Sequence, residues 1–333
     1  MTSLRLAAMA LALACAMAAP ARAGTGFADI TLTNPVEGGP MPVIVFYPSD
    51  EASVAAKTTV GPFDLAAQRG AMPTAGRHPL VVLSHGTGGT RLGHHDSLAA
   101  LARAGIVAAA VEHPRDNFRD HSGLGTDRQL YGRAADITAV IDGILADPRL
   151  GPLVDPGRIG VAGFSAGGYT ALTVVGARPD PAAFATYCQA NATDTLFCRG
   201  RSGPPPFSPQ PPVMHDARVR AAFVMAPGFG FLFDRAGLAP VGVPVRLYRA
   251  ENDELLRHPW HAQRIADNLS RPAEYEVVAG AGHYVFLVPC APVIAAENPA
   301  LCTDPPGVDR VAVHRRLNDD MVGFFGRTLA PGP

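Results

Sequence analysis

A serine between two glycines is the feature of this chain with the clearest chemical meaning. Gly163, Ser165 and Gly167 form the pattern Gly-x-Ser-x-Gly once in 333 residues. The glycines, which lack a Cβ atom, let the chain turn sharply from strand to helix and leave the serine strained, with its Oγ exposed. The apolar, strand-like residues 158–164 and the small residues 166–175 favour such a nucleophile over an ordinary strand–turn–helix junction.

A serine hydroxyl needs a base to take its proton and an acid to orient that base. We predict His283 as the base, because it follows the last predicted strand and fits the chain order serine, acid, histidine. For the acid we predict Asp253, in a carboxylate-rich loop after a late strand, with Glu251 as the alternative. Rival histidines, interpreted mostly as loop or surface residues, are His85, His94, His95 and His113.

Attack on a carbonyl also requires backbone N–H donors for the oxyanion, each worth about 3–4 kcal/mol. Such donors come from the residue after the nucleophile and from a loop after an early strand. Here these are Ala166 and Thr87, with Gly86 or Gly88 as alternatives to Thr87. The loop lacks the Gly-Lys-Ser/Thr ending of a phosphate-binding loop, so nucleotide binding is not expected.

A second group of polar residues contains side chains of the types that bind metals: His94, His95, Asp96, His113, Asp116 and His121. No pair among them has firm metal-ligand spacing. We interpret them as loop and helix-cap residues at the catalytic edge of the sheet, and we predict neither a metal nor an organic cofactor.

The elements that must position these residues alternate between strands and helices. Strands are predicted over 30–33, 43–47, 80–84, 107–111, 158–164, 218–225, 243–248 and 274–278. Helices are predicted over 95–104, 127–146, 166–175, 260–269 and 309–329. After an antiparallel opening pair, this alternation predicts an α/β fold with a mainly parallel, doubly wound sheet flanked by helices. We expect a single domain over 24–333.

A proline-rich stretch, 178–215, interrupts this alternation directly after the predicted nucleophile helix. An insertion at this place is either a lid over the serine or a surface excursion, and both interpretations stay open. Long loops of this kind are usually either functional or disordered.

Residues 1–23 are typical of a secretory signal peptide: Arg5 precedes a short apolar core, and Ala21-Arg22-Ala23 offers a cleavage site. A lipoprotein modified at Cys15 is a weaker alternative. We therefore expect a periplasmic or secreted protein. Four cysteines would remain, and their spacing in an exported chain favours disulfides Cys188–Cys198 and Cys290–Cys302.

The composition and net charge of the chain limit the classes of binding partner that we expect. Removing Arg5 and Arg22 from 28 basic residues, against 29 acidic ones, leaves a net charge of about −3 and no basic run. Nucleic acid is therefore not expected as a partner. We expect a small-molecule ester substrate, no stable membrane insertion, and a monomer in preference to an oligomer.

Taken together, these motifs resemble the α/β-hydrolase superfamily. Within it, the chain is similar to exported bacterial proteins identified as predicted dienelactone hydrolases, which are related to platelet-activating-factor acetylhydrolases. The segments that carry the resemblance are 81–86, 94–96, 112–114, 163–168, 248–255 and 280–290. Dienelactone hydrolase proper has a cysteine nucleophile where this chain has Ser165, which favours general ester hydrolysis.

The resemblance implies an exported serine carboxylic-ester hydrolase that uses an acyl-enzyme and takes short- to medium-chain or small-alcohol esters. The acetylhydrolases place their acid after the strand that follows the nucleophile, but 224–227 contains no carboxylate. A phospholipid esterase, a cutinase-like polyester hydrolase, a serine peptidase and a non-catalytic binding protein remain as alternatives.

Overall fold

The computed structural model describes residues 24–51, 53, 55–198, 207–208 and 212–331. The predicted signal peptide, 1–23, lies outside the described residues, as does Cys15. In the described part of the chain, no helix combines the length and the apolar character that a membrane span requires.

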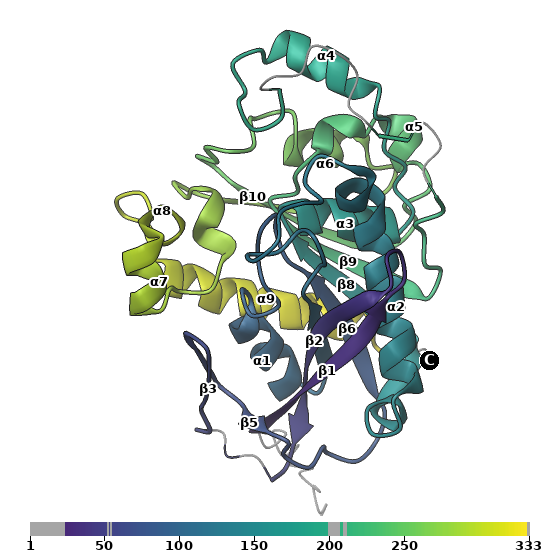
Figure 1. Cartoon of the computed structure of the whole chain (residues 1–333), viewed down its shortest axis with the longest axis vertical. Helices are drawn as coiled ribbons and strands as arrows, with labels where there is room; N and C mark the ends of the chain where they lie inside the picture. Colours follow the sequence, from purple (N-terminus) through teal and green to yellow (C-terminus); the bar gives the residue numbers. More distant parts are fainter. Residues whose placement is uncertain (1–23, 52, 54, 199–206, 209–211, 332–333) are drawn as a thin grey trace, which may run out of the picture.

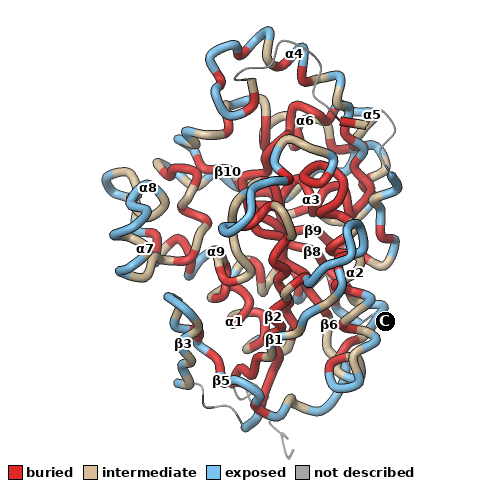
Figure 2. Tube along the Cα trace, in the orientation of Figure 1, coloured by how far each residue is buried: buried red, intermediate tan, exposed pale blue. Residues whose placement is uncertain are grey.

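One mixed sheet forms the centre of the molecule, and its central strands are mostly buried, whereas the edge strands β5 and β11 contain no fully buried residue (Figures 1 and 2). Its order within the described residues is β11-β10-β9-β8-β6-β7-β2-β1-β5. The bounds are β1 Gly24–Asn34, β2 Gly39–Ser49, β5 Gln68–Arg69, β6 His78–Ser84, β7 Val107–Val111, β8 Val154–Phe164, β9 Val219–Met225, β10 Val245–Ala250 and β11 Glu274–Val278. β1 and β2 pair antiparallel, as do β2 and β7, whereas neighbours from β7 to β11 pair parallel.

Helices cover both faces of this sheet. On one side α1 (His95–Arg103) packs against the long C-terminal α9 (Arg310–Thr328). On the other, α2 (Arg133–Ala146) packs against α3 (Ala166–Val174), which contacts β6, β8 and β9. α6 (Ala262–Asn268) packs on β10. The predicted α/β fold with a mainly parallel sheet is confirmed.

The structure also contains elements that the sequence pattern did not predict. Within the insertion, α4 (Ala183–Ala190) packs on the 3₁₀ turn η3 (Gly230–Leu232) and lies at the top of Figure 1. Other additions are the hairpin β3 (Thr58–Val60) and β4 (Phe63–Leu65), and the helices α5 (Arg235–Leu238), α7 (Pro292–Glu297) and α8 (Pro299–Cys302). All are too short for hydrophobic periodicity to reveal them.

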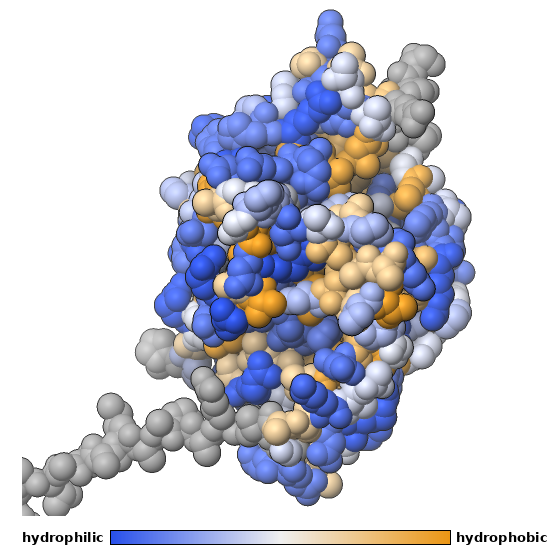
Figure 3. All heavy atoms as spheres, turned by 90° about the vertical axis from the view of Figure 1, so that its left-hand side faces the viewer, coloured by the Kyte–Doolittle hydropathy of each residue, from blue (hydrophilic) through white to orange (hydrophobic). Residues whose placement is uncertain are grey.

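The two predicted disulfides are present. Cys188–Cys198 closes a loop after α4, and Cys290–Cys302 joins the segment before α7 to the end of α8. On the face shown in Figure 3, hydrophobic residues form separate patches among hydrophilic ones.

Parallel pairing places the carboxyl ends of the strands along one edge. The loops after β6, β8, β10 and β11 carry Thr87, Ser165, Asp253 and His283 respectively. In open α/β sheets, ligands bind in the crevice outside this edge.

Candidate active site

Ser165 lies in a strained turn between β8 and α3. Its φ of 55° and ψ of −118° place it outside the conformations ordinary residues prefer. A Cβ atom on Gly163 would lie 2.0 Å from the carbonyl oxygen of Gly167, and one on Gly167 would lie 1.9 Å from that of Ser84. Both positions therefore require glycine, as the motif predicted.

The loops after β10 and β11 bring an imidazole and a carboxylate to this serine. The Oγ of Ser165 lies 3.1 Å from Nε2 of His283, whose Nδ1 lies 2.7 Å from Oδ2 of Asp253. The side chains of His283 and Asp253 are nearly inaccessible to solvent. The other carboxylate oxygen of Asp253 accepts the backbone N–H groups of Leu255 and Leu256, at 3.0 and 2.8 Å. The carboxylate is thereby held in one orientation toward the ring.

The neighbouring carboxylates bind backbone groups of the same region. Glu251 accepts the N–H of Gly280 at 2.7 Å, and Glu254 accepts the N–H of His283 at 2.9 Å. Glu251, the alternative acid, is thus engaged with the loop that carries the histidine, whereas Asp253 contacts the imidazole.

Thr87 and Ala166, the predicted oxyanion donors, line one cavity together with Ser165 and His283. Ala166 is the first residue of α3, where backbone N–H groups have no partner within the helix. Gly88, one of the alternatives, donates its N–H to Oδ1 of Asp116 at 2.9 Å. This bond supports the loop that carries Thr87.

Arg133, which is fully buried, connects the two segments that carry these donors. It donates to the carbonyl of His85 and, at 2.6 Å, to Oδ2 of Asp116. It also donates to Oγ1 of Thr170 at 3.3 Å, and that hydroxyl donates to the carbonyl of Ala166. The guanidinium therefore ties the loop after β6 to the start of α3.

A second serine–histidine–aspartate arrangement lies beneath this loop. Oγ of Ser84 is 2.8 Å from Nε2 of His113, and Nδ1 of His113 is 2.7 Å from Oδ2 of Asp136. All three residues have no exposed surface, and none of them lines the cavity. They therefore form part of the buried polar network rather than a site that a substrate reaches. The sequence carries no motif that would have revealed it.

All four rival histidines are buried, which corrects the sequence interpretation of most of them as loop or surface residues; His95, at the start of α1, is 9% exposed. His85 and His94 are 1% exposed and His113 is 0% exposed. The reason is that loops after parallel strands fold back over the sheet edge and cover one another. No group of three or more possible metal ligands occurs among the residues that the structure describes.

Burial of histidines predicts that acid destabilises the fold. Burial lowers the pKa of His94 to about 4 and those of His85 and His261 to about 3, from a usual 6.5. Below pH 6.5 the unfolded chain takes up protons that the folded chain refuses, so stability falls with pH by up to about 1.4 kcal/mol per unit for each group. Burial also lowers the pKa values of His95 and His113, whereas it raises the pKa of Asp136 to about 6, which opposes the effect of one of these five histidines.

We therefore expect the free energy of unfolding to fall by at least about 4 kcal/mol between pH 7 and pH 5. Thermal unfolding followed by circular dichroism at both values measures the change. His94→Gln should show a shallower dependence, and equal melting temperatures at the two values would contradict the prediction.

The cavity beside Ser165 has a volume of about 350 Å³. Six phenylalanine and tyrosine residues contribute to its wall: Phe164, Phe184, Phe197, Phe207, Phe229 and Tyr284. Leucine side chains and the polar residues Thr87 and Gln129 also line the cavity. Phe184, Phe197 and Phe207 belong to the insertion, which therefore contributes to the cavity. Phe231 and Phe286 are not among the lining residues and lie in the hydrophobic core.

Comparisons with known proteins agree with this architecture. Among solved structures, a ferulic acid esterase from Streptomyces cinnamoneus is similar with a TM-score of 0.64 and 22% identity, over 95% of this chain and 94% of that one. A puromycin-hydrolyzing peptidase from Mycobacterium tuberculosis gives a TM-score of 0.55 and 16% identity, over 92% of this chain but only 40% of that one. At these identities the likeness shows the fold alone.

No curated protein matches the sequence significantly. The pattern that defines the alpha/beta hydrolase family, by contrast, matches residues 81–296, more than half of the chain. That range contains the serine turn, the loops after β6 and β10, and His283. The chain belongs to the alpha/beta hydrolase family.

Proposed function

We propose that this protein is a serine carboxylic-ester hydrolase that works through an acyl-enzyme. The observation that carries the proposal is the chain of contacts from Ser165 through His283 to Asp253 at the wall of one cavity. With Nδ1–H donated to the carboxylate, Nε2 is free to accept the serine proton. The hydroxyl is thereby converted into a nucleophile.

In the first half of the reaction, Oγ of Ser165 attacks the ester carbonyl carbon while its proton passes to Nε2 of His283. The oxygen that becomes negative accepts the N–H groups of Ala166 and Thr87. The intermediate then collapses, and the alcohol leaves with the proton from His283. Water repeats the sequence on the acyl-enzyme and releases the acid, while Asp253 stays ionised throughout.

The cavity favours a neutral, apolar substrate. Among the described residues that line it, none is Asp, Glu, Lys or Arg. A charged group would be moved from water into this lining without an ionic partner, which is costly. This favours short- to medium-chain or small-alcohol esters over a phospholipid headgroup or a lactone that carries a carboxylate. The narrower resemblance to dienelactone hydrolases and platelet-activating-factor acetylhydrolases remains a proposal.

An exported location is part of the same proposal. The two disulfides are compatible with an oxidising compartment such as the periplasm or the outside of the cell. The signal peptide that would direct export falls on residues 1–23.

A series of 4-nitrophenyl esters from acetate to palmitate, assayed beside the matching 4-nitroanilides, tests the activity. We expect turnover of at least about 1 s⁻¹ on the best ester, a typical value for enzymes, and an optimum among the shorter acyl chains. Anilides should be hydrolysed far more slowly. Preference for an anilide would instead indicate a peptidase, and inactivity of folded protein on every ester would contradict the proposal.

A further inference from the structure

One wall of the cavity is built by a short loop that follows α4. We call residues 191–198 the wall loop. Its Leu196 and Phe197 line the cavity beside Ser165. The ring of Phe197 lies 5.1 Å from that of Phe229, which lines the same cavity, and 5.2 Å from that of Phe231 in the core. A loop of the insertion therefore supplies part of the surface that a bound ester would touch.

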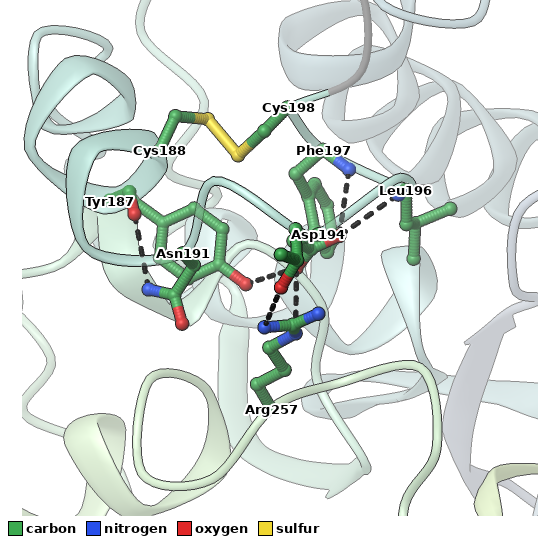
Figure 4. The surroundings of a disulfide bond; sticks show 9 residues. Tyr187, Cys188, Asn191, Asp194, Leu196, Phe197, Cys198 and Arg257 are labelled. Atoms are coloured by element: carbon green, nitrogen blue, oxygen red, sulfur yellow. Dashed lines mark hydrogen bonds and ion pairs between the residues drawn. A yellow bond between two sulfur atoms is a disulfide. The ribbon is translucent and has the colours of Figure 1, made fainter.

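The wall loop is folded around one buried carboxylate (Figure 4). Asp194 is 4% exposed, and its Oδ1 accepts the backbone N–H groups of Leu196 and Phe197 at 2.9 and 3.2 Å. Its Oδ2 accepts the hydroxyl of Tyr187 on α4. Asp194 therefore holds the backbone of Leu196 and Phe197, the same two residues of this loop that line the cavity.

Two further links fix this loop in place. Oδ2 of Asp194 lies 3.8 Å from Nε of Arg257, and Nη1 of the same guanidinium donates to Oγ1 of Thr193 at 3.1 Å. Arg257 directly follows Leu255 and Leu256, which line the cavity and bind Asp253 through their N–H groups. The disulfide Cys188–Cys198 joins the end of the loop to α4, as Figure 4 shows. The wall loop is therefore tied both to the insertion helix and to the loop that carries the proposed acid.

We propose that the wall loop determines the substrate specificity of this site, with Asp194 as its positioning residue, and that it selects neutral esters carrying a bulky ring. The aromatic and leucine side chains, together with the absence of charged groups among the described lining residues, suit a flat apolar group. A methyl-sized group would leave most of a cavity of about 350 Å³ without contacts. The inference rests on the proposed esterase function.

The test compares kcat/KM on ethyl cinnamate and benzyl acetate, which carry a ring on either side of the ester bond, with kcat/KM on ethyl acetate. In the wild-type protein we expect at least one ring ester to be hydrolysed ten or more times as efficiently as ethyl acetate. Asp194→Asn, and separately the pair Cys188→Ser and Cys198→Ser, should lower that ratio by about tenfold, mainly through KM. A general loss of folded enzyme would lower kcat/KM on all three esters equally, so a fall in the ratio of kcat/KM on the ring ester to kcat/KM on ethyl acetate indicates a role in specificity.

The pair Cys290→Ser and Cys302→Ser is the matched control, because it removes a disulfide outside the cavity lining and should leave the ratio unchanged. Leu196→Ala, at a residue that is 55% exposed, should keep the fold even where a variant of Asp194 does not, and should also lower the ratio.

Different failures of this experiment have different meanings. If wild-type protein hydrolyses ethyl acetate but shows no preference for a ring ester, the specificity inference is wrong while the esterase proposal stands. The same holds if Asp194→Asn and Leu196→Ala lower all three rates in parallel or leave the ratio unchanged. If the wild-type protein hydrolyses none of the three and no fluorophosphonate labels Ser165, the esterase proposal itself has failed.

Discussion

Ser165→Ala is expected to lower kcat for ester hydrolysis by about 10⁶-fold. The alanine has no oxygen to attack the carbonyl, so the covalent route is lost and only the binding and oxyanion contacts remain to assist water. KM should change much less, because the side chain that is removed is small and the cavity wall stays intact. Hydrolysis of 4-nitrophenyl acetate by the two purified proteins measures the effect.

The chain offers an unusually close control for this experiment. Ser84 also has a histidine and an aspartate in line with it, but it is completely buried and does not line the cavity. A fluorophosphonate should therefore label Ser84→Ala and fail to label Ser165→Ala. Labelling of Ser165→Ala at the wild-type rate would show that another residue is the nucleophile.

The second large effect concerns the acid, where Asp253→Asn is expected to lower kcat by about 10⁴-fold. The amide oxygen can still accept the N–H groups of Leu255 and Leu256, so the loop keeps its shape. The amide nitrogen would then face Nδ1 of His283 as a donor and favour the tautomer in which Nε2 carries the proton. An imidazole in that form cannot take the proton of Ser165.

Glu251→Gln provides the comparison, because it changes a carboxylate of the same region that binds the backbone of Gly280. An amide oxygen can make the same hydrogen bond, so we expect kcat to fall by only a few-fold. Steady-state kinetics on one ester, with melting temperatures measured in parallel, decides between the two residues. A larger loss in Glu251→Gln than in Asp253→Asn would transfer the role of acid to Glu251.

The parts of the molecule that the sequence predicted well are those that local patterns encode. Gly163 is required by its contact with Gly167 within the turn itself, and the buried strands of the parallel sheet appear as apolar runs. His283 could be chosen because the order of residues along the chain matches the order of the strands. Short helices such as α4, by contrast, lack enough residues to show a period.

Contacts between distant segments could not be predicted in this way. Nothing near Asp194 in the sequence indicates Arg257, and nothing near Arg133 indicates that its side chain reaches His85 and Asp116. The buried histidines were misinterpreted for the same reason, since polar residues in a loop are ordinarily exposed. Whether such a residue is covered depends on how neighbouring loops meet at the sheet edge, which only the folded structure determines.

The order of the strands determines at what stage of synthesis the residues of the candidate active site can come together. Ser165 follows β8 in the middle of the sheet, but Asp253 and His283 follow β10 and β11, the last two strands of the chain and the outermost on their side. While the polypeptide is still emerging from the ribosome, the serine turn has neither partner. A fragment that ends before β11 would contain Ser165, the proposed nucleophile, without His283, the proposed base. If Ser165 and His283 act as proposed, incomplete chains that lack the final strand would be inactive.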